Sequence, residues 1–121
     1  MAESIVSTKS FSFAVRIIQL CRHLGKRHVE RELLSQLIRS GTSITANLSE
    51  AVYGNSKKDF FSKARIALKE CAETHTWLKL LHAVGSLTDA EYDSINQDCM
   101  EILKMLISIN KTGQAFHTGE N

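Results

Sequence analysis

The stretch "QLIRSGTSITANLSEA", residues 36–51, gives the clearest indication of the fold class. Its apolar and small residues recur at alternating spacings of four and three positions: Leu37, Gly41, Ile44, Leu48 and Ala51. Residues at this spacing lie on one face of an α-helix, because the helix turns once in about 3.6 residues. The pattern therefore predicts a helix from about residue 29 to residue 53, with one face buried in a core.

The same helix carries very little charge. Residues 33–53 contain only two charged side chains, Arg39 and Glu50, whereas a bundle helix usually has a charged outer face. Its polar residues form a second stripe, one position before the first: Gln36, Ser40, Ser43, Asn47 and Glu50. Such a stripe can face another subunit, where polar groups set the register, or it can hydrogen-bond neighbouring helices of the same chain. Both interpretations remain open at this point.

The apolar spacing recurs in three further segments, which glycine-containing breaks separate. They span about residues 10–24, 57–84 and 89–110. Ser56 with Asp59, and Thr88 with Glu91, have the spacing of helix start signals. No proline interrupts any of the segments. Four helices with short connections predict an all-α protein, an antiparallel up-down-up-down four-helix bundle.

Length and composition limit the classes of protein that the chain can form. At 121 residues it is long enough for one domain, residues 1–121, and we expect a frayed tail over 111–121. The N-terminus lacks the apolar run of a signal peptide, and no segment has about 18 uninterrupted apolar residues. Three cysteines without metal-ligand spacing favour reduced thiols. We therefore expect a cytoplasmic protein with no membrane partner and no cofactor.

The formal net charge of +2 conceals an uneven distribution. Residues 1–69 carry twelve Lys and Arg against five acids, whereas residues 70–121 carry three against eight. Such an imbalance can mark an anion-binding surface, or it can let the two halves of a bundle attract each other.

The cations form two groups, which are the candidate nucleic-acid-binding residues. The first half of the third helix contains Lys57, Lys58, Lys63, Arg65 and Lys69, and the first turn is surrounded by Arg22, Lys26, Arg27 and Arg31. An up-down bundle places these groups at opposite ends. Each group can bind a polyanion, or it can be an ordinary solvated surface.

A cation and two carboxylates are predicted to meet between the second and third helices. Folding the chain back near residue 54 places Arg39 opposite Glu70 and Gln36 opposite Glu73, so we expect an ion pair with a structural role. Paired carboxylates also occur in di-iron bundles, but those sites need Glu-x-x-His segments, which the sequence lacks. We therefore predict no metal site. The predicted structural polar network comprises Gln36, Arg39, Ser43, Asn47, Glu50, Glu70 and Glu73.

Signatures of catalysis are missing from the sequence. No Ser or Cys lies near a His and an acid in a recognisable nucleophile context, and there is no glycine-rich phosphate loop. Trp77 has the spacing of a packing residue rather than of a platform for stacking bases. We therefore predict a non-enzymatic protein with no catalytic residues.

Four motifs resemble, in order and spacing, those of a bacterial family of four-helix-bundle proteins. They are "FAVRI" (13–17), "QLIRSGTSITANLSEA" (36–51), "SKKDF" (56–60) and "IALKECAETHTWLKLL" (66–81). The family is named for proteins encoded in intervening sequences of the large-subunit ribosomal RNA gene, and the resemblance covers nearly all of residues 10–110. The chain differs at Ala51, where the family usually has glycine, and at His75-Thr76, where it has an aromatic residue.

The resemblance implies a closed bundle, a ring of five protomers and no enzymatic activity. It also relates the chain to the accessory proteins of diversity-generating retroelements, which bind a reverse transcriptase and nucleic acid through basic surfaces. We therefore expect a homo-oligomer, specifically a homopentamer, that binds RNA or DNA, or a reverse transcriptase, as an accessory factor. The alternative is a structural scaffold for protein contacts with no nucleic-acid role.

Overall fold

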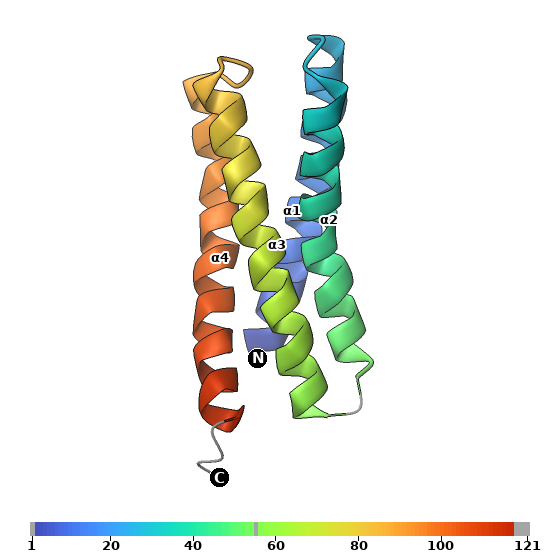
Figure 1. Cartoon of the computed structure of the whole chain (residues 1–121), viewed down its shortest axis with the longest axis vertical. Helices are drawn as coiled ribbons and strands as arrows, with labels where there is room; N and C mark the ends of the chain where they lie inside the picture. The colour runs from blue at the N-terminus through green and yellow to red at the C-terminus, as the bar shows by residue number, and fades with distance from the viewer. Residues whose placement is uncertain (1, 55, 118–121) are drawn as a thin grey trace.

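A computed structural model describes residues 2–54 and 56–117, and the side chains of residues 5–51, 53–54 and 56–115. These residues form four helices: α1 (Ala2–Lys26), α2 (Arg31–Val52), α3 (Lys57–Ala83) and α4 (Asp89–His117). The α1–α2 and α3–α4 turns lie at one end of the molecule and the α2–α3 turn at the other (Figure 1). Each helix packs against two neighbours in a closed cycle, in which the α1–α4 contact is the least extensive. The predicted all-α, antiparallel four-helix bundle is confirmed.

Two helix ends differ from the prediction. α1 begins at Ala2 rather than near residue 10, because Val6 and Ser10 continue the buried stripe of the helix towards the N-terminus. α4 continues to His117 rather than ending near residue 110, because Gly113 is buried and extends its stripe. The prediction of a frayed tail is therefore wrong for residues 111–117, and residues 118–121 lie outside the described part of the chain.

One face of each helix forms the core. The largest fully buried side chains include Phe13, Ile17, Leu24, Leu37, Ile44, Leu48, Leu78, Leu81, Ile102 and Leu106. Burying one such side chain contributes about 1.5–3 kcal/mol to folding. Ser40, which was predicted to lie on the second stripe of α2, is instead fully buried, and its hydroxyl lies 2.9 Å from the Thr74 hydroxyl of α3. The pair satisfies two polar groups inside the core, where an unpaired hydroxyl would be costly.

Local side-chain bonds set the starts of α3 and α4, as the sequence predicted. The Ser56 hydroxyl accepts a hydrogen bond from the Asp59 amide at 3.2 Å. The Thr88 hydroxyl accepts from the Glu91 amide at 3.1 Å, and the Glu91 carboxylate accepts from the Thr88 amide at 2.9 Å. Between α3 and α4, Gly85 adopts a φ of 83°, which glycine tolerates without steric cost. Within the described residues, no helix is long and apolar enough to span a membrane.

Candidate nucleic-acid interface

Three of the predicted α3 cations, Lys58, Arg65 and Lys69, share one face of the helix. Their spacings of seven and four residues separate successive positions by about 10 Å and about 6 Å along the axis. All three are exposed and form no ion pair with another described residue. Lys57 is likewise exposed, but the Lys63 ammonium lies 2.6 Å from Glu50 and joins α3 to α2 instead.

α4 adds two lysines that the sequence analysis did not single out. The Asn110 amide donates a hydrogen bond to the Ala64 carbonyl at 3.2 Å, which places the last part of α4 beside the first half of α3. Lys104 and Lys111 are seven residues apart and share a face of α4. Both are exposed and without an ion pair among the described residues. We call Lys58, Arg65, Lys69, Lys104 and Lys111 the basic face.

The helix segments that carry most of the basic face contain no acid. Neither residues 60–69 of α3 nor residues 102–115 of α4 include an Asp or Glu. Glu70 follows the α3 segment and pairs with Arg39 of α2, and Glu101 precedes the α4 segment and pairs with Lys9 of α1. Asp59 precedes the α3 segment, next to Lys58. The lack of Asp and Glu around Lys104 and Lys111 is the feature of the sequence that could have indicated that α4 contributes to the basic face.

The second predicted group, at the α1–α2 turn, is less available to an anion. Arg27 donates two hydrogen bonds to Glu91, at 2.9 Å and 2.6 Å, and ties the turn to the start of α4. Arg22, Lys26 and Arg31 are exposed, but Glu30 and Glu32 are exposed beside them. The turn lies at the opposite end of the bundle from the start of α3, as predicted (Figure 1).

Ion pairs between the basic first half and the acidic second half of the sequence join helices of the bundle. Lys9, Arg16, Arg27 and Arg39 each pair with an acid from residues 70–121. The attraction between the two halves therefore accounts for these four cations, and it does not account for the basic face.

The predicted contact between Arg39 and the two carboxylates of α3 is confirmed. Arg39 donates to Glu70 at 3.1 Å and also to Glu73, and Gln36 accepts from Arg39 at 3.2 Å. Hydrogen bonds from Arg39 and from the Trp77 indole lower the pKa of Glu73 below its usual value. Because the Arg39 side chain is 47% exposed, solvent screens the pair.

The other predicted members of the polar network lie apart from Arg39. The Asn47 amide donates to the Ser43 carbonyl at 2.8 Å, so these two residues bond within α2. Glu50 pairs with Lys63 near the α2–α3 turn. The seven predicted residues therefore form three separate groups rather than one network.

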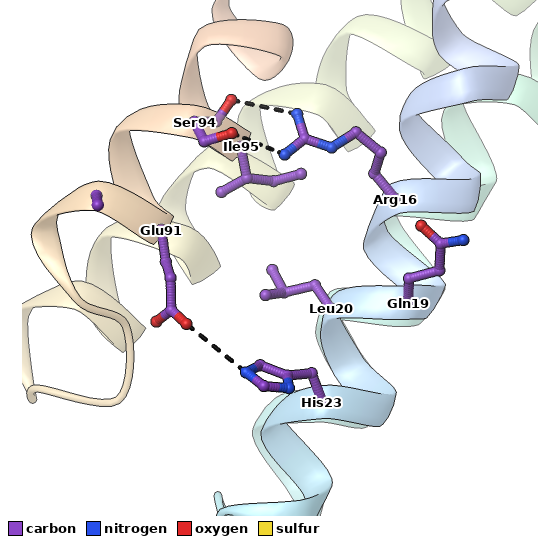
Figure 2. Close-up of a pocket in the computed structure, with 8 residues that line it drawn as sticks. Arg16, Gln19, Leu20, His23, Glu91, Ser94 and Ile95 are labelled. Atoms are coloured by element: carbon purple, nitrogen blue, oxygen red, sulfur yellow. Dashed lines mark hydrogen bonds and ion pairs between the residues drawn. The ribbon is translucent and has the colours of Figure 1, made fainter.

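A cavity of about 450 Å³ lies between α1 and α4 (Figure 2). Its charged side chains are committed to holding these helices: Arg16 donates to Ser94 at 2.8 Å, and Glu91 lies 3.7 Å from His23 (Figure 2). The hydrogen bonds from Arg27 lower the pKa of Glu91 to about 2. Glu91 therefore stays ionised near neutral pH and is a poor general acid.

Two of the buried cysteines, Cys21 and Cys71, are also poorly suited to catalysis. A hydrogen bond with Cys99, together with burial, raises the pKa of Cys71, and burial raises the pKa of Cys21 to about 11. Both thiols therefore remain protonated near neutral pH, and the thiolate is the nucleophilic form. Across the described residues, no three His, Cys, Asp or Glu side chains gather as a metal site would require.

Comparison with known proteins places the chain in a family. The sequence model of the 23S rRNA-intervening sequence protein family matches residues 2–108. The chain belongs to this family. A protein of unknown function from the S23 ribosomal protein family of Bacteroides thetaiotaomicron has a similar crystal structure, with 47% identity and a TM-score of 0.87 over 92% of this chain and 99% of that chain. No curated protein matches the chain. The predicted family is thereby confirmed, and its relation to retroelement accessory proteins remains a prediction.

Proposed function

We propose that this family member is a non-enzymatic, homo-oligomeric accessory protein that binds nucleic acid through the basic face. The observation that supports this function is a cluster of five cations that form no ion pair with a described residue, four of which lie on acid-free segments of α3 and α4. Positive charge that is not neutralised by nearby acids attracts phosphates over a Debye length, about 8 Å at physiological ionic strength. A row of such charges on adjacent helices suits an extended polyanion better than one small anion.

Self-association is supported by apolar side chains on the outer side of α1 and α2. Phe11 is 64% exposed and Val15 is 40% exposed, one turn apart on α1. Ile38 of α2 is 38% exposed and lies one turn after Leu34. The Leu34 carbonyl accepts a hydrogen bond from the Cys21 thiol, so this part of α2 lies beside α1. A second copy that covered these side chains would also explain the nearly uncharged surface of α2.

Assembly would strengthen nucleic-acid binding. Each copy repeats the basic face, so contacts that are weak individually act together through a high effective concentration. The family resemblance makes five protomers the specific proposal and a reverse transcriptase a further partner. The exposed apolar side chains alone favour the second candidate function, a scaffold for protein contacts without nucleic acid.

The test compares two triple variants that each remove three positive charges. In the first, Lys58, Arg65 and Lys69 of the basic face become Gln, and in the second Arg22, Lys26 and Arg31 at the α1–α2 turn become Gln. Binding of labelled RNA and DNA is titrated from about 50 to about 200 mM salt. We expect the wild type to bind more weakly as salt rises, and the basic-face variant to lose about one unit of salt slope for each phosphate contact removed.

The α1–α2 variant is the matched control and should keep most of the affinity. Circular dichroism and light scattering check that both variants fold and assemble like the wild type. Equal binding by the wild type and the basic-face variant would refute the proposed interface. A wild type that binds neither RNA nor DNA in about 50 mM salt would favour the scaffold function.

A further inference from the structure

A second cavity, of about 360 Å³, opens between α3 and α4 beside the basic face. It is lined by Phe61, Arg65, Leu68, Asn110, Gly113 and Gln114. Its volume lies within the range of sites that take small organic groups, roughly 300–1,000 Å³. Arg65 belongs both to the cavity and to the basic face, so a group in the cavity would lie next to the row of cations.

The cavity offers two planar groups that can stack on another ring. The Phe61 ring lies against the α4 backbone, since a Cβ added at Gly113 would be only 2.6 Å from its Cδ1 atom. Phe60 meets the Phe61 ring edge-to-face at a centroid distance of 5.4 Å, which further fixes its orientation. Arg65 contributes a flat guanidinium that is exposed and forms no ion pair with a described residue.

The cavity also offers two side-chain amides that can hydrogen-bond to a ligand, those of Asn110 and Gln114. Asn110 donates from its amide nitrogen to the Ala64 carbonyl at 3.2 Å and to the Leu106 carbonyl at 2.8 Å. Both amide hydrogens are thereby used, so Oδ1 remains as an acceptor. Gln114 is exposed and has no hydrogen-bond partner among the described side chains, which leaves its amide to donate or accept.

We propose that this cavity binds one unpaired base of a single-stranded nucleic acid whose phosphates lie along the basic face. Stacking on aromatic rings and guanidinium planes, with hydrogen bonds to the base edge, is how proteins hold unpaired bases. The Oδ1 atom of Asn110 suits the exocyclic amino group of adenine or cytosine. A duplex keeps its bases stacked and paired, so placing one in the cavity would cost the free energy of unstacking and unpairing it.

This inference rests on the proposed function, and the experiment separates the two. Wild-type protein is titrated with an oligodeoxyadenylate of roughly 12 nucleotides, with an abasic oligomer of equal phosphate number, and with a duplex of equal length. We expect the intact strand to bind at least about fivefold more tightly than the abasic strand, the gain from stacking one base. The abasic strand should keep the salt-dependent part of the affinity.

Two variants locate the effect in the cavity. Arg65→Lys keeps the charge and loses the guanidinium plane, and Phe61→Leu keeps an apolar side chain and loses the ring. Phe61→Leu should lower the affinity for the intact strand and leave the affinity for the abasic strand unchanged. Arg65 also belongs to the basic face, so Arg65→Lys should weaken binding of the intact strand more than binding of the abasic strand. Arg22→Lys, the same exchange at the other end of the bundle, should change neither affinity.

The outcomes distinguish the two proposals. If intact, abasic and duplex probes bind equally and with the same salt dependence, the base site is refuted and the proposed function stands. If the two cavity variants weaken intact and abasic strands alike, their role is structural and the base site is again refuted. If no probe binds in about 50 mM salt, both proposals fall.

Discussion

Gly41 of α2 lies directly against Ile17 of α1. A Cβ added at Gly41 would be 2.9 Å from Cγ2 and 3.1 Å from Cγ1 of Ile17, closer than carbon atoms normally approach. Ile17 is fully buried and branched at its Cβ, so its side chain cannot easily move aside. The glycine on the core stripe of α2 is therefore what lets the first two helices pack closely.

Replacing Gly41 by Ala should destabilise the protein. The overpacking costs about 1–3 kcal/mol, which outweighs the gain of about 1 kcal/mol in helix propensity. Gly25→Ala is the control, because its Cβ would meet only Leu34 at 4.0 Å, and it should stabilise the protein by about 0.5–1 kcal/mol. Urea unfolding measures both. In an Ile17→Ala background, Gly41→Ala should become stabilising, and the absence of this reversal would contradict the close contact.

Arg39→Met should lower the free energy of unfolding by about 1 kcal/mol, since the pair is half exposed and screened. The loss arises because Glu70 and Glu73 then face each other without a cation between them. Adding Glu70→Gln and Glu73→Gln should recover part of it. Urea midpoints of the single and triple variants provide the measurement, and an unchanged midpoint for Arg39→Met would show that the pair is energetically neutral.

Sequence reasoning found the Arg39 contact because the short α2–α3 turn fixes the register of two adjacent helices. It did not find the link between Arg27 and Glu91, since those residues meet only when the α1–α2 turn packs beside the start of α4. Lys104 and Lys111 were overlooked for a related reason: they lie in the acidic half of the sequence, and only packing places the last part of α4 beside the first half of α3.

The helix ends were missed where small or polar residues continue an apolar stripe. Ser10 and Gly113 break the hydrophobic pattern of α1 and α4 in the sequence, yet both are buried. Gly113 is buried because the Phe61 ring covers it, a contact between distant parts of the chain.

The ion pair between Arg27 and Glu91 should make the free energy of unfolding fall at acid pH. The pKa of Glu91 is lowered from 4.5 to about 2, so the unfolded chain takes up its proton at higher pH than the folded chain does. The contribution of Glu91 is therefore fully present above about pH 4.5 and is lost as pH falls towards 2. Glu91→Gln should lower the urea midpoint at neutral pH and reduce its change across this window. Asp93→Asn replaces an exposed acid of the same helix and should change neither the midpoint nor its dependence on pH. If the urea midpoints of wild type and Glu91→Gln vary in parallel with pH, the linkage is contradicted.

Self-association through α1 and α2 should depend on Phe11. Its side chain is 64% exposed in a single chain, and a second copy that covers it would exclude water from the ring. Phe11→Glu should therefore reduce the assembled mass, because a carboxylate buried in that contact would lose its hydration without gaining a partner. Val84→Glu is the control: Val84 is 67% exposed, but it lies at the α3–α4 turn, away from the predicted contact.

Light scattering and native mass spectrometry at micromolar concentration distinguish these cases. We expect wild type and Val84→Glu to assemble alike, with five protomers as the predicted number, and Phe11→Glu to yield smaller species of unchanged helix content. Because each smaller species carries fewer copies of the basic face, Phe11→Glu should also bind a long polyanion less tightly than Val84→Glu does. A wild type that stays monomeric, or a Phe11→Glu variant that assembles normally, would show that this apolar surface is not the contact between copies.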